Sequence, residues 1–138
     1  MIATRFPLAH SVCMSRNTDS KLVAIVDDDD SVRGTLKELL RAAGFTSRTF
    51  ESAEAFLGSG HQQETACLIT DIRMPGMSGL DLQARLNAER CRIPTIFITA
   101  HGDEEMRFQA LRAGAVEFLP KPFDDEVLIE SVRAALKH

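Results

Sequence analysis

The chain has 138 residues, of which 44% are hydrophobic and 26% are charged, and its formal net charge is −4. This length is typical of a single domain, and the composition is that of an ordinary globular protein. The negative balance argues against a surface that coats nucleic acid, and no apolar run reaches the ~20 residues of a membrane-spanning helix. We expect a cytoplasmic domain with no direct contact to nucleic acid or to a membrane.

Residues 1–20 differ from the rest of the chain. They are polar and irregular, are broken by Pro7 and lack the apolar core of a secretory leader. We expect a disordered tail here, followed by one domain over residues 21–138. Met14 could equally be the natural start of a shorter chain.

The 3 cysteines of the chain, Cys13, Cys67 and Cys91, contain no CxxC pair. An odd and scattered set is typical neither of a disulfide framework nor of a zinc site. We expect all of them to be free thiols.

From residue 21 onward, short apolar runs alternate with longer segments of helical periodicity. Continuous β-branched runs predict buried strands, and a weaker alternation predicts an edge strand at 46–50. The expected strands cover 22–26, 46–50, 66–70, 95–99 and 115–119, and the expected helices cover 32–43, 52–58, 78–88, 103–114 and 124–137. Five β-α repeats predict an α/β fold with a doubly wound, five-stranded parallel sheet and helices on both faces.

Capping residues predict where the helices begin and end. Asp30 or Ser31 is expected to cap the first helix. Ser52 and Ser78 are expected to begin the second and third helices, and Gly58 is expected to end the second.

Chemically active side chains follow four of the predicted strands. Asp27 and Asp28 come after the first strand, and Asp71 comes after the third. Thr99 ends the fourth strand, and Lys121 follows the fifth. Because such sheets bind ligands at the carboxyl ends of their strands, we expect these side chains to meet at one edge.

Crowded carboxylates need a cation nearby. Two unit charges ~4 Å apart interact by about 4 kcal/mol at an effective dielectric of 20, so the acids either keep a proton or bind a divalent ion. Oxygen ligands suit Mg²⁺, whereas the histidine and thiolate ligands that zinc prefers are missing from this edge apart from His101. We expect Asp27 and Asp28 to bind Mg²⁺.

Mg²⁺ beside a carboxylate, with an ammonium and a hydroxyl opposite, is an arrangement for phosphoryl transfer. Asp71 is the expected nucleophile and phosphoacceptor because it stands alone after the central strand. Lys121 is expected to neutralise charge on the transferred group, and Thr99 is expected to hydrogen-bond it.

Four stretches, IVDDDD, TDIRMPGMSG, FITAHGD and EFLPKPF, resemble the receiver domains of response regulators, the CheY-like family, in order and spacing. The resemblance covers about residues 21–138. SAEAFL and GAVEFLPKPF are similar to receivers of the FixJ and NarL type, which usually precede a DNA-binding domain. The resemblance implies a flavodoxin-like strand order of 2-1-3-4-5 and a role in two-component signalling as a phosphoacceptor domain that is not an enzyme.

The resemblance also implies roles for individual residues. Asp71 would accept a phosphoryl group from a sensor histidine kinase or a phosphotransfer protein, and it would contribute to the metal site. Asp28 would bind Mg²⁺ directly, Asp27 would bind it through water, and the backbone carbonyl of Arg73 would supply another ligand. A cis peptide bond at Lys121–Pro122, common in this family, would aim the lysine into the site.

Switching and lifetime are further implications of the resemblance. Thr99 would move toward a phosphorylated Asp71, and Phe118 would turn into the space left behind. This change would remodel the face formed by the fourth helix, the fifth strand and the fifth helix, and a homodimer could form on phosphorylation. Arg73 and His101 would tune the lifetime of the phosphoryl group.

Several alternatives stay open at this point. Asp29 and Asp30 are expected only to cap the next helix, although the metal pair could shift one place to Asp28 and Asp29. Phe118 could be an ordinary core residue. A phosphatase of haloacid-dehalogenase type also uses a strand-end aspartate, but it would need a second carboxylate where Arg73 stands. The remaining alternatives are a pseudo-receiver that signals by contact alone and, within the receiver interpretation, a stand-alone domain or a fragment of a transcriptional regulator.

Overall fold

The computed structural model describes residues 22–100 and 104–137. The expected tail over residues 1–20 and the expected role of His101 fall outside the described residues. The elements follow the order β1 (Leu22–Val26), α2 (Asp30–Ala42), β2 (Thr46–Phe50), α3 (Ala53–Ser59), a 3₁₀ helix (Gln62–Glu64), β3 (Thr65–Asp71), α4 (Gly79–Ala88), β4 (Thr95–Thr99), α5 (Glu104–Arg112), β5 (Glu117–Pro120) and α6 (Asp125–Leu136).

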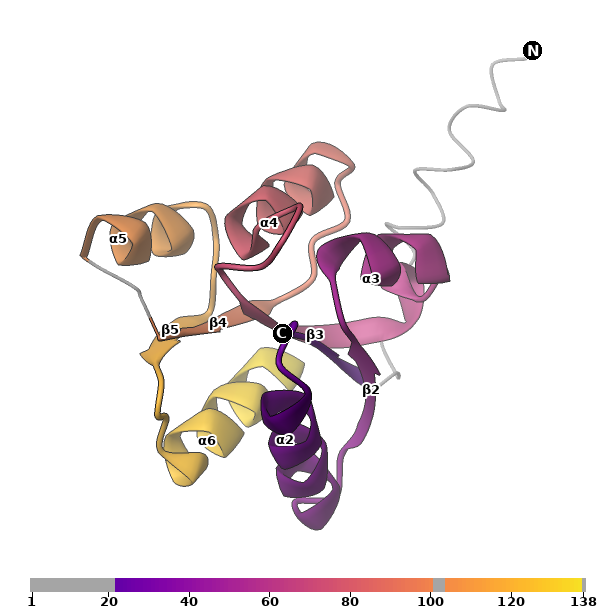
Figure 1. Cartoon of the computed structure of the whole chain (residues 1–138), viewed down its shortest axis with the longest axis vertical. Coiled ribbons are helices and arrows are strands. Elements are labelled where there is room, and N and C mark those ends of the chain that lie inside the picture. The colour runs from indigo at the N-terminus through magenta and orange to yellow at the C-terminus, as the bar shows by residue number, and fades with distance from the viewer. Residues whose placement is uncertain (1–21, 101–103, 138) are drawn as a thin grey trace.

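The strands form one 5-stranded sheet in the order β2-β1-β3-β4-β5. Every neighbouring pair of strands is parallel. Figure 1 shows α3, α4 and α5 on one face of the sheet and α2 and α6 on the other. The predicted doubly wound α/β fold with strand order 2-1-3-4-5 is therefore confirmed, and β2 is an edge strand as expected. None of the helices in the described ranges has the length and apolar character that crossing a membrane requires.

Alternate residues of the central strands pack against helices on opposite faces of the sheet. In β1, Val23 and Ile25 belong to an apolar cluster with α2 and α6, whereas Ala24 and Val26 belong to a second cluster with α3 and α4. All four side chains are fully buried. Burial on both faces is the reason that this strand reads as a continuous apolar run. Close packing on both sides gives the carboxyl edge of the sheet a fixed geometry.

The cap of α2 lies one residue before the predicted position. The carboxylate of Asp29 accepts hydrogen bonds from the backbone N–H of Ser31 at 2.8 Å and of Val32 at 3.3 Å. The expectation of Asp30 or Ser31 as the cap was wrong, whereas a capping role for Asp29 is confirmed. Four aspartates in a row offer the same chemistry, so the extended backbone of Asp29 decides which one caps the helix.

Other element ends also differ from expectation. Gly58 does not end α3, because the helix continues through Ser59 and Gly60 adopts the left-handed conformation with φ of 77°. Strand β5 begins at Glu117, two residues later than predicted from the apolar run. The 3₁₀ helix Gln62–Glu64 was not predicted, because so short an element shows no periodicity.

The cysteines depart from the expected free thiols. Cys67 is free and fully buried, and burial raises the pKa of its thiol to about 12. Cys91 is disulfide-bonded, so the expectation was wrong at this position. Sequence spacing alone does not reveal such a pairing. Cys13 lies outside the described residues.

Candidate functional site

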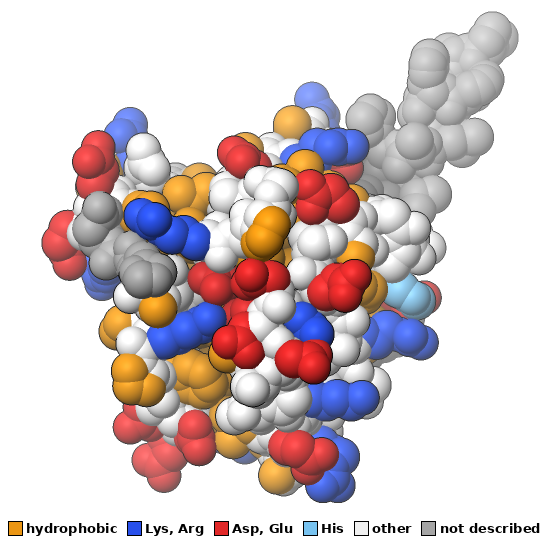
Figure 2. All heavy atoms as spheres, in the orientation of Figure 1, with side chains coloured by type: hydrophobic (Ala, Val, Ile, Leu, Met, Phe, Trp, Pro, Cys, Tyr) orange, Lys and Arg blue, Asp and Glu red, His pale blue; other side chains and the backbone are white. Residues whose placement is uncertain are grey.

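Three carboxylates converge at the carboxyl edge of the sheet. Asp27 directly follows β1, Asp71 is the last residue of β3, and these two strands are neighbours. Asp28 completes the group, since the three residues each offer a carboxylate oxygen within 4.8 Å of the others. Figure 2 shows acidic side chains gathered near the middle of the visible face, with basic side chains on either side. The structure thus brings together the strand-end acids, whereas Asp29 is used as a helix cap.

Lys121, which follows β5, places a cation between two of these acids. Its Nζ donates hydrogen bonds to Asp27 Oδ2 and Asp71 Oδ2, both at 3.0 Å. Asp27 is fully buried, Asp71 is 7% exposed, and Asp28 faces solvent. The Lys121–Pro122 peptide bond is cis, as the resemblance implied. Two buried carboxylates therefore share one ammonium.

The same contacts perturb the ionisation of the site. Burial raises the pKa of Asp27 above its ordinary value of 3.8, and hydrogen bonds from the Asp29 N–H and from Lys121 oppose only part of that rise. Burial would lower the pKa of Lys121, but hydrogen bonds to Asp71 and Asp27 raise it above 10.5. Lys121 is therefore fully charged at neutral pH. A perturbed acid with a specific charged partner is typical of a functional site.

Arg33 of α2 stabilises the loop that carries Asp27 and Asp28. This role was not predicted from the sequence. Its Nη1 donates a hydrogen bond to the backbone carbonyl of Asp27 at 2.6 Å, and its Nη2 pairs with the carboxylate of Asp30. The backbone N–H of Asp29 donates to Asp27 Oδ1 at 2.9 Å. These bonds fix the loop that carries Asp27 and Asp28. The spacing of Asp30 and Arg33, three residues apart on a helix, was the available signal.

The backbone after Asp71 is also fixed by hydrogen bonds, like the loop that carries Asp27 and Asp28. Asp71 Oδ1 accepts a hydrogen bond from the Ile72 N–H at 2.7 Å. The N–H of Gly79, the first residue of α4, donates to the Ile72 carbonyl at 2.9 Å. A Cβ on Gly79 would lie 2.2 Å from the backbone oxygen of Asp71, so a side chain does not fit here. The sequence pattern does not reveal this requirement, because the collision is with the backbone of the preceding strand and depends on how the loop between them folds back.

Thr99 and Arg73, two further residues of the predicted site, lie in different settings. Thr99 is buried at the end of β4, and its carbonyl accepts a hydrogen bond from the Lys121 N–H at 2.9 Å. Arg73 is exposed in the loop after Asp71. The metal and lifetime roles of Arg73 stay predictions, and His101 lies outside the described residues.

Phe118 is a buried member of the core. It is 8% exposed and belongs to an apolar cluster with Ile72 and Phe97. Its ring centroid lies 6.4 Å from that of Phe97. The ring already points inward, as the alternative of an ordinary core residue requires, and its switch role stays a prediction.

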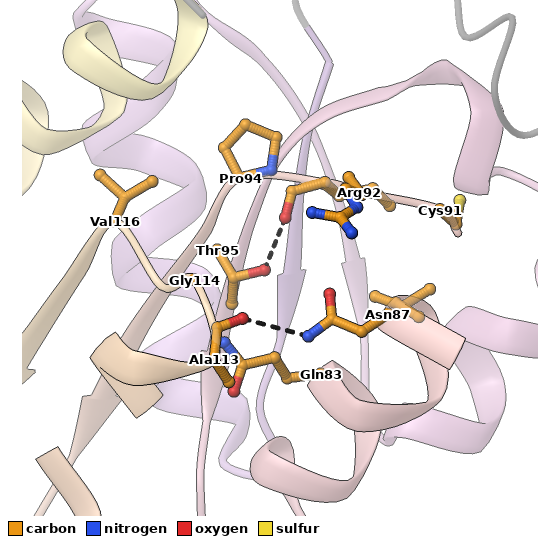
Figure 3. A pocket seen from close by; sticks show the side chains of 11 residues that line it. Gln83, Asn87, Cys91, Arg92, Pro94, Thr95, Ala113, Gly114 and Val116 are labelled. Carbon is orange, nitrogen blue, oxygen red and sulfur yellow. Dashed lines mark hydrogen bonds between the residues drawn. The ribbon is translucent and has the colours of Figure 1, made fainter. Parts of the chain in front are cut away.

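A cavity of about 240 Å³ lies at the amino ends of β4 and β5, between the ends of α4 and α5 (Figure 3). It is lined by Thr95, which begins β4, and by Val116, which precedes β5. Asn87 donates a hydrogen bond to the Ala113 carbonyl at 3.1 Å, and Thr95 donates to the Ile93 carbonyl at 2.8 Å. None of its described lining residues carries a carboxylate. The cavity is therefore separate from the aspartate cluster at the carboxyl ends of the strands.

The acidic edge has the donor set of a magnesium site. The described cluster consists of aspartates alone, and carboxylate oxygens are ligands that Mg²⁺ accepts. Mg²⁺ needs only one or two protein carboxylates because it keeps several waters. An adjacent buried carboxylate and an ammonium are the parts that phosphoryl transfer to an aspartate uses. The chemistry of these residues therefore fits both a magnesium ion and a phosphoryl group.

The chain matches the family model of the response regulator receiver domain over residues 23–133. It belongs to this family, and it is a receiver domain of the two-component signalling systems. The match confirms the resemblance of the four sequence stretches.

Curated relatives and solved structures agree with this assignment. The chain is 44% identical over 118 residues to the transcriptional regulatory protein FixJ of Azorhizobium caulinodans, covering 86% of this chain and 56% of that protein. It is 46% identical over 121 residues to the response regulator protein TmoT of Ectopseudomonas mendocina, covering 88% of this chain and 55% of that protein. The crystal structure of FixJ-N is similar, with a TM-score of 0.77 and 43% identity over 86% of this chain and 95% of that chain. The chain spans about half the length of the curated relatives it matches.

Proposed function

We propose that this receiver domain takes a phosphoryl group onto Asp71 in the presence of Mg²⁺ and thereby switches a signalling surface. The observation that carries the proposal is the ammonium of Lys121, which bonds the buried carboxylates of Asp27 and Asp71 at 3.0 Å each. The donor would be a sensor histidine kinase or a phosphotransfer protein in the cytoplasm, where we expect this domain to act, because receiver domains of response regulators partner with histidine kinases.

In the proposed reaction, a carboxylate oxygen of Asp71 attacks the phosphorus of a phosphohistidine on the donor. A new O–P bond forms at Asp71, the P–N bond breaks, and the electron pair stays on the imidazole of the donor, which takes up a proton. Lys121 neutralises charge on the phosphoryl oxygens, and the hydroxyl of Thr99 donates a hydrogen bond to them. Positioning supplies most of the remaining acceleration.

Asp27 and Asp28 would hold Mg²⁺ together with Asp71 and the backbone carbonyl of Arg73. When bound, the ion supplies positive charge that offsets the charge of the phosphoryl oxygens. Asp28 is the exposed member of the group and is open to an incoming hydrated ion. Asp27, which is fully buried, would contribute through water.

The phosphorylated protein would favour a second conformation. A phosphoryl group adds about −1.5 to −2 charges, which draws Thr99 toward Asp71 and opens space beside Phe118. The face formed by α5, β5 and α6 would then change, and a homodimer could form on it. A complete reversal of the two populations requires about 5.5 kcal/mol of differential stabilisation. Arg73 and His101 would set how long the modified state lasts.

Acetyl phosphate and beryllofluoride test the phosphoacceptor directly. With acetyl phosphate and Mg²⁺, the wild-type protein should gain the mass of one phosphoryl group, and Asp71→Asn should gain none. Asp125→Asn alters an exposed carboxylate at the start of α6 and should behave as wild type. Beryllofluoride should shift the amide resonances of α5 and β5 in the wild-type protein only when Mg²⁺ is present.

Equal modification of Asp71→Asn and wild type would overturn the proposal. Continuous release of phosphate from small phosphate esters would favour the phosphatase alternative instead. A protein that takes no phosphoryl group at any Mg²⁺ concentration would favour the pseudo-receiver.

A further inference from the structure

Glu54, in the first turn of α3, reaches the loop that follows Asp71. Its Oε2 accepts a hydrogen bond from the backbone N–H of Met77 at 2.9 Å, across 23 positions of sequence. Ser52 begins the helix and fixes its first turn, because its side chain accepts a hydrogen bond from the Ala55 N–H at 3.0 Å. The carboxylate therefore comes from a capped helix end and not from a free loop.

The loop is shaped to admit this carboxylate. Gly76, which precedes Met77, has a φ of 80°, a conformation that side chains rarely adopt. A Cβ on Gly76 would lie 2.7 Å from Glu54 Oε2, closer than van der Waals contact allows. Glycine at this position therefore serves both the turn and the approach of Glu54.

Apolar contacts hold the same two segments together. Met74 and Met77 of the loop belong to one cluster with Ala53 and Phe56 of α3, and Met74 is only 8% exposed. Packing sets the distance between α3 and the loop. A hydrogen bond is directional, so the bond to Glu54 adds control over the orientation of the loop backbone.

The loop over residues 72–78 connects to two parts of the proposed site, Asp71 and the backbone carbonyl of Arg73. Its start is Asp71, and its base is closed by the hydrogen bond from the Gly79 N–H to the Ile72 carbonyl at 2.9 Å. Arg73, whose backbone carbonyl is the proposed additional ligand, lies between this base and the residue that Glu54 holds. Mg²⁺ demands near-ideal octahedral geometry, so the orientation of a carbonyl ligand affects its affinity.

We propose that Glu54 is a positioning residue for the phosphoryl site. Its hydrogen bond to Met77 fixes residues 72–78 in the conformation in which the Arg73 carbonyl serves the metal. Glu54 itself touches neither the ion nor the phosphoryl group. The inference rests on the proposed function, because it assigns Glu54 to the Mg²⁺ and phosphoryl site described there.

Two substitutions at Glu54 separate the hydrogen bond from the charge. Both Glu54→Ala and Glu54→Gln remove the negative charge, but only glutamine keeps an oxygen that can accept from Met77. We expect Glu54→Ala to weaken Mg²⁺ binding about three- to tenfold and to slow phosphorylation by acetyl phosphate at limiting Mg²⁺ by a similar factor. Glu54→Gln should stay within about twofold of wild type. Glu51→Ala, an exposed acid outside the contact, is the matched control.

Amide hydrogen exchange at Met77 gives a readout that does not depend on Mg²⁺. Exchange should be about tenfold faster in Glu54→Ala than in wild type, and glutamine should restore most of the protection. If Glu54→Ala exchanges faster at Met77 but binds Mg²⁺ as tightly as wild type, Glu54 is not a positioning residue. If exchange at Met77 does not change, the hydrogen bond to Glu54 does not restrain the loop. A wild-type protein that binds no Mg²⁺ and takes no phosphoryl group would overturn the proposed function, which distinguishes that failure from failure of the inference alone.

Discussion

Asp27 shows how single residues of this site balance opposing effects. Its burial disfavours the ionised form, while the Asp29 N–H and the Lys121 ammonium favour it, and the net result is a raised pKa. Asp71 accepts from the same ammonium and adds like charge nearby. A buried carboxylate with a raised pKa opposes folding at neutral pH, a cost that functional groups often carry.

Replacement of Asp27 by asparagine is expected to stabilise the folded protein at neutral pH. The neutral amide avoids the burial of a charge, and Lys121 keeps its hydrogen bond to Asp71. The thermal midpoint at pH 7 should rise by roughly 3–5 °C, measured by circular dichroism. Asp125→Asn, at an exposed position, should leave the midpoint within about 1 °C of wild type.

The same substitution carries a pH signature with a defined sign. The pKa of Asp27 in the folded protein lies above its ordinary value of 3.8, so the folded state binds more protons than the unfolded state between the two values. The contribution of this group to stability is therefore complete below pH 3.8 and is lost as the pH rises through the folded-state pKa. The advantage of Asp27→Asn should disappear as the pH falls toward 3.8. An advantage that persists there would contradict the assigned cause.

Among the elements, α4 starts in direct contact with the site. It begins at Gly79, against the backbone of Asp71. Ser78 caps it through a bond from the Asp81 N–H at 3.0 Å, with the Asp81 carboxylate facing the Ser78 N–H in return. The cap and the glycine fix the start of the helix, so we expect a shift of the Asp71 backbone to displace the start of α4.

Two glycine substitutions in helices are expected to have opposite effects. Gly79→Ala places a Cβ 2.2 Å from the backbone oxygen of Asp71, so the strand or the helix has to shift. Overpacking against backbone should lower the free energy of unfolding by about 2–3 kcal/mol. In exposed Gly34 of α2, nothing lies within 4 Å of the added Cβ. Gly34→Ala should therefore raise the free energy by about 0.5–1 kcal/mol.

Urea denaturation of both glycine variants checks this contrast. Equal effects of the two substitutions would show that the close approach at Gly79 is relieved at no cost in free energy. Slower phosphorylation of Gly79→Ala by acetyl phosphate would additionally link the start of α4 to the geometry of Asp71.

Helices and strands were predictable from the sequence where their burial produces a recognisable pattern of apolar residues. Strands β1 and β4 are buried along nearly their whole length, so their apolar runs gave correct limits at 22–26 and 95–99. Helix ends were less predictable where neighbouring residues have equal chemistry, as with Asp29 and Asp30 or with Gly58 and Gly60. Local propensity does not distinguish such neighbours, and tertiary packing does.

The acids of the site were predictable because the edge of a parallel sheet collects strand ends. Asp27 and Lys121 directly follow strands and Asp71 ends one, so the fold alone brings them together. The support for these residues was not predictable. Glu54 reaches Met77 across 23 positions, and the sequence pattern carries no trace of a side chain that bonds a distant backbone group.

At the scale of the whole molecule, the sheet separates an apolar cluster packed against α2 and α6 from apolar clusters packed against α3, α4 and α5, and the site lies at the carboxyl ends of its strands. Val23 and Ile25 face the first of these clusters, and Ala24 and Val26 face the other side, so apolar packing on both faces reaches the strand that Asp27 follows. Binding at this end should therefore stabilise the entire domain, since the ligand binds only when the strand ends are assembled.

Mg²⁺ is expected to raise the thermal stability of the whole domain. At a concentration of about 100 times its Kd, a ligand that binds only the folded state adds about 2.7 kcal/mol to the free energy of unfolding. Calorimetry in MgCl₂, compared with NaCl at equal ionic strength, measures this gain. Asp28→Asn should fold normally, because Asp28 is exposed, and should lose most of the gain. An equal gain in the variant would exclude Asp28 as a ligand.

The shared ammonium of Lys121 also bears on how tightly a metal ion would bind at the proposed site. In the free domain this side chain acts as an internal counterion for Asp27 and Asp71, with both contacts at 3.0 Å. A divalent ion at the proposed site would compete with this covalently attached ammonium for the carboxylates. Its apparent affinity would therefore be lower than for three carboxylates without a counterion. We therefore expect Mg²⁺ to bind the proposed site weakly and to exchange readily, so that occupancy would follow the concentration of free Mg²⁺ around the domain.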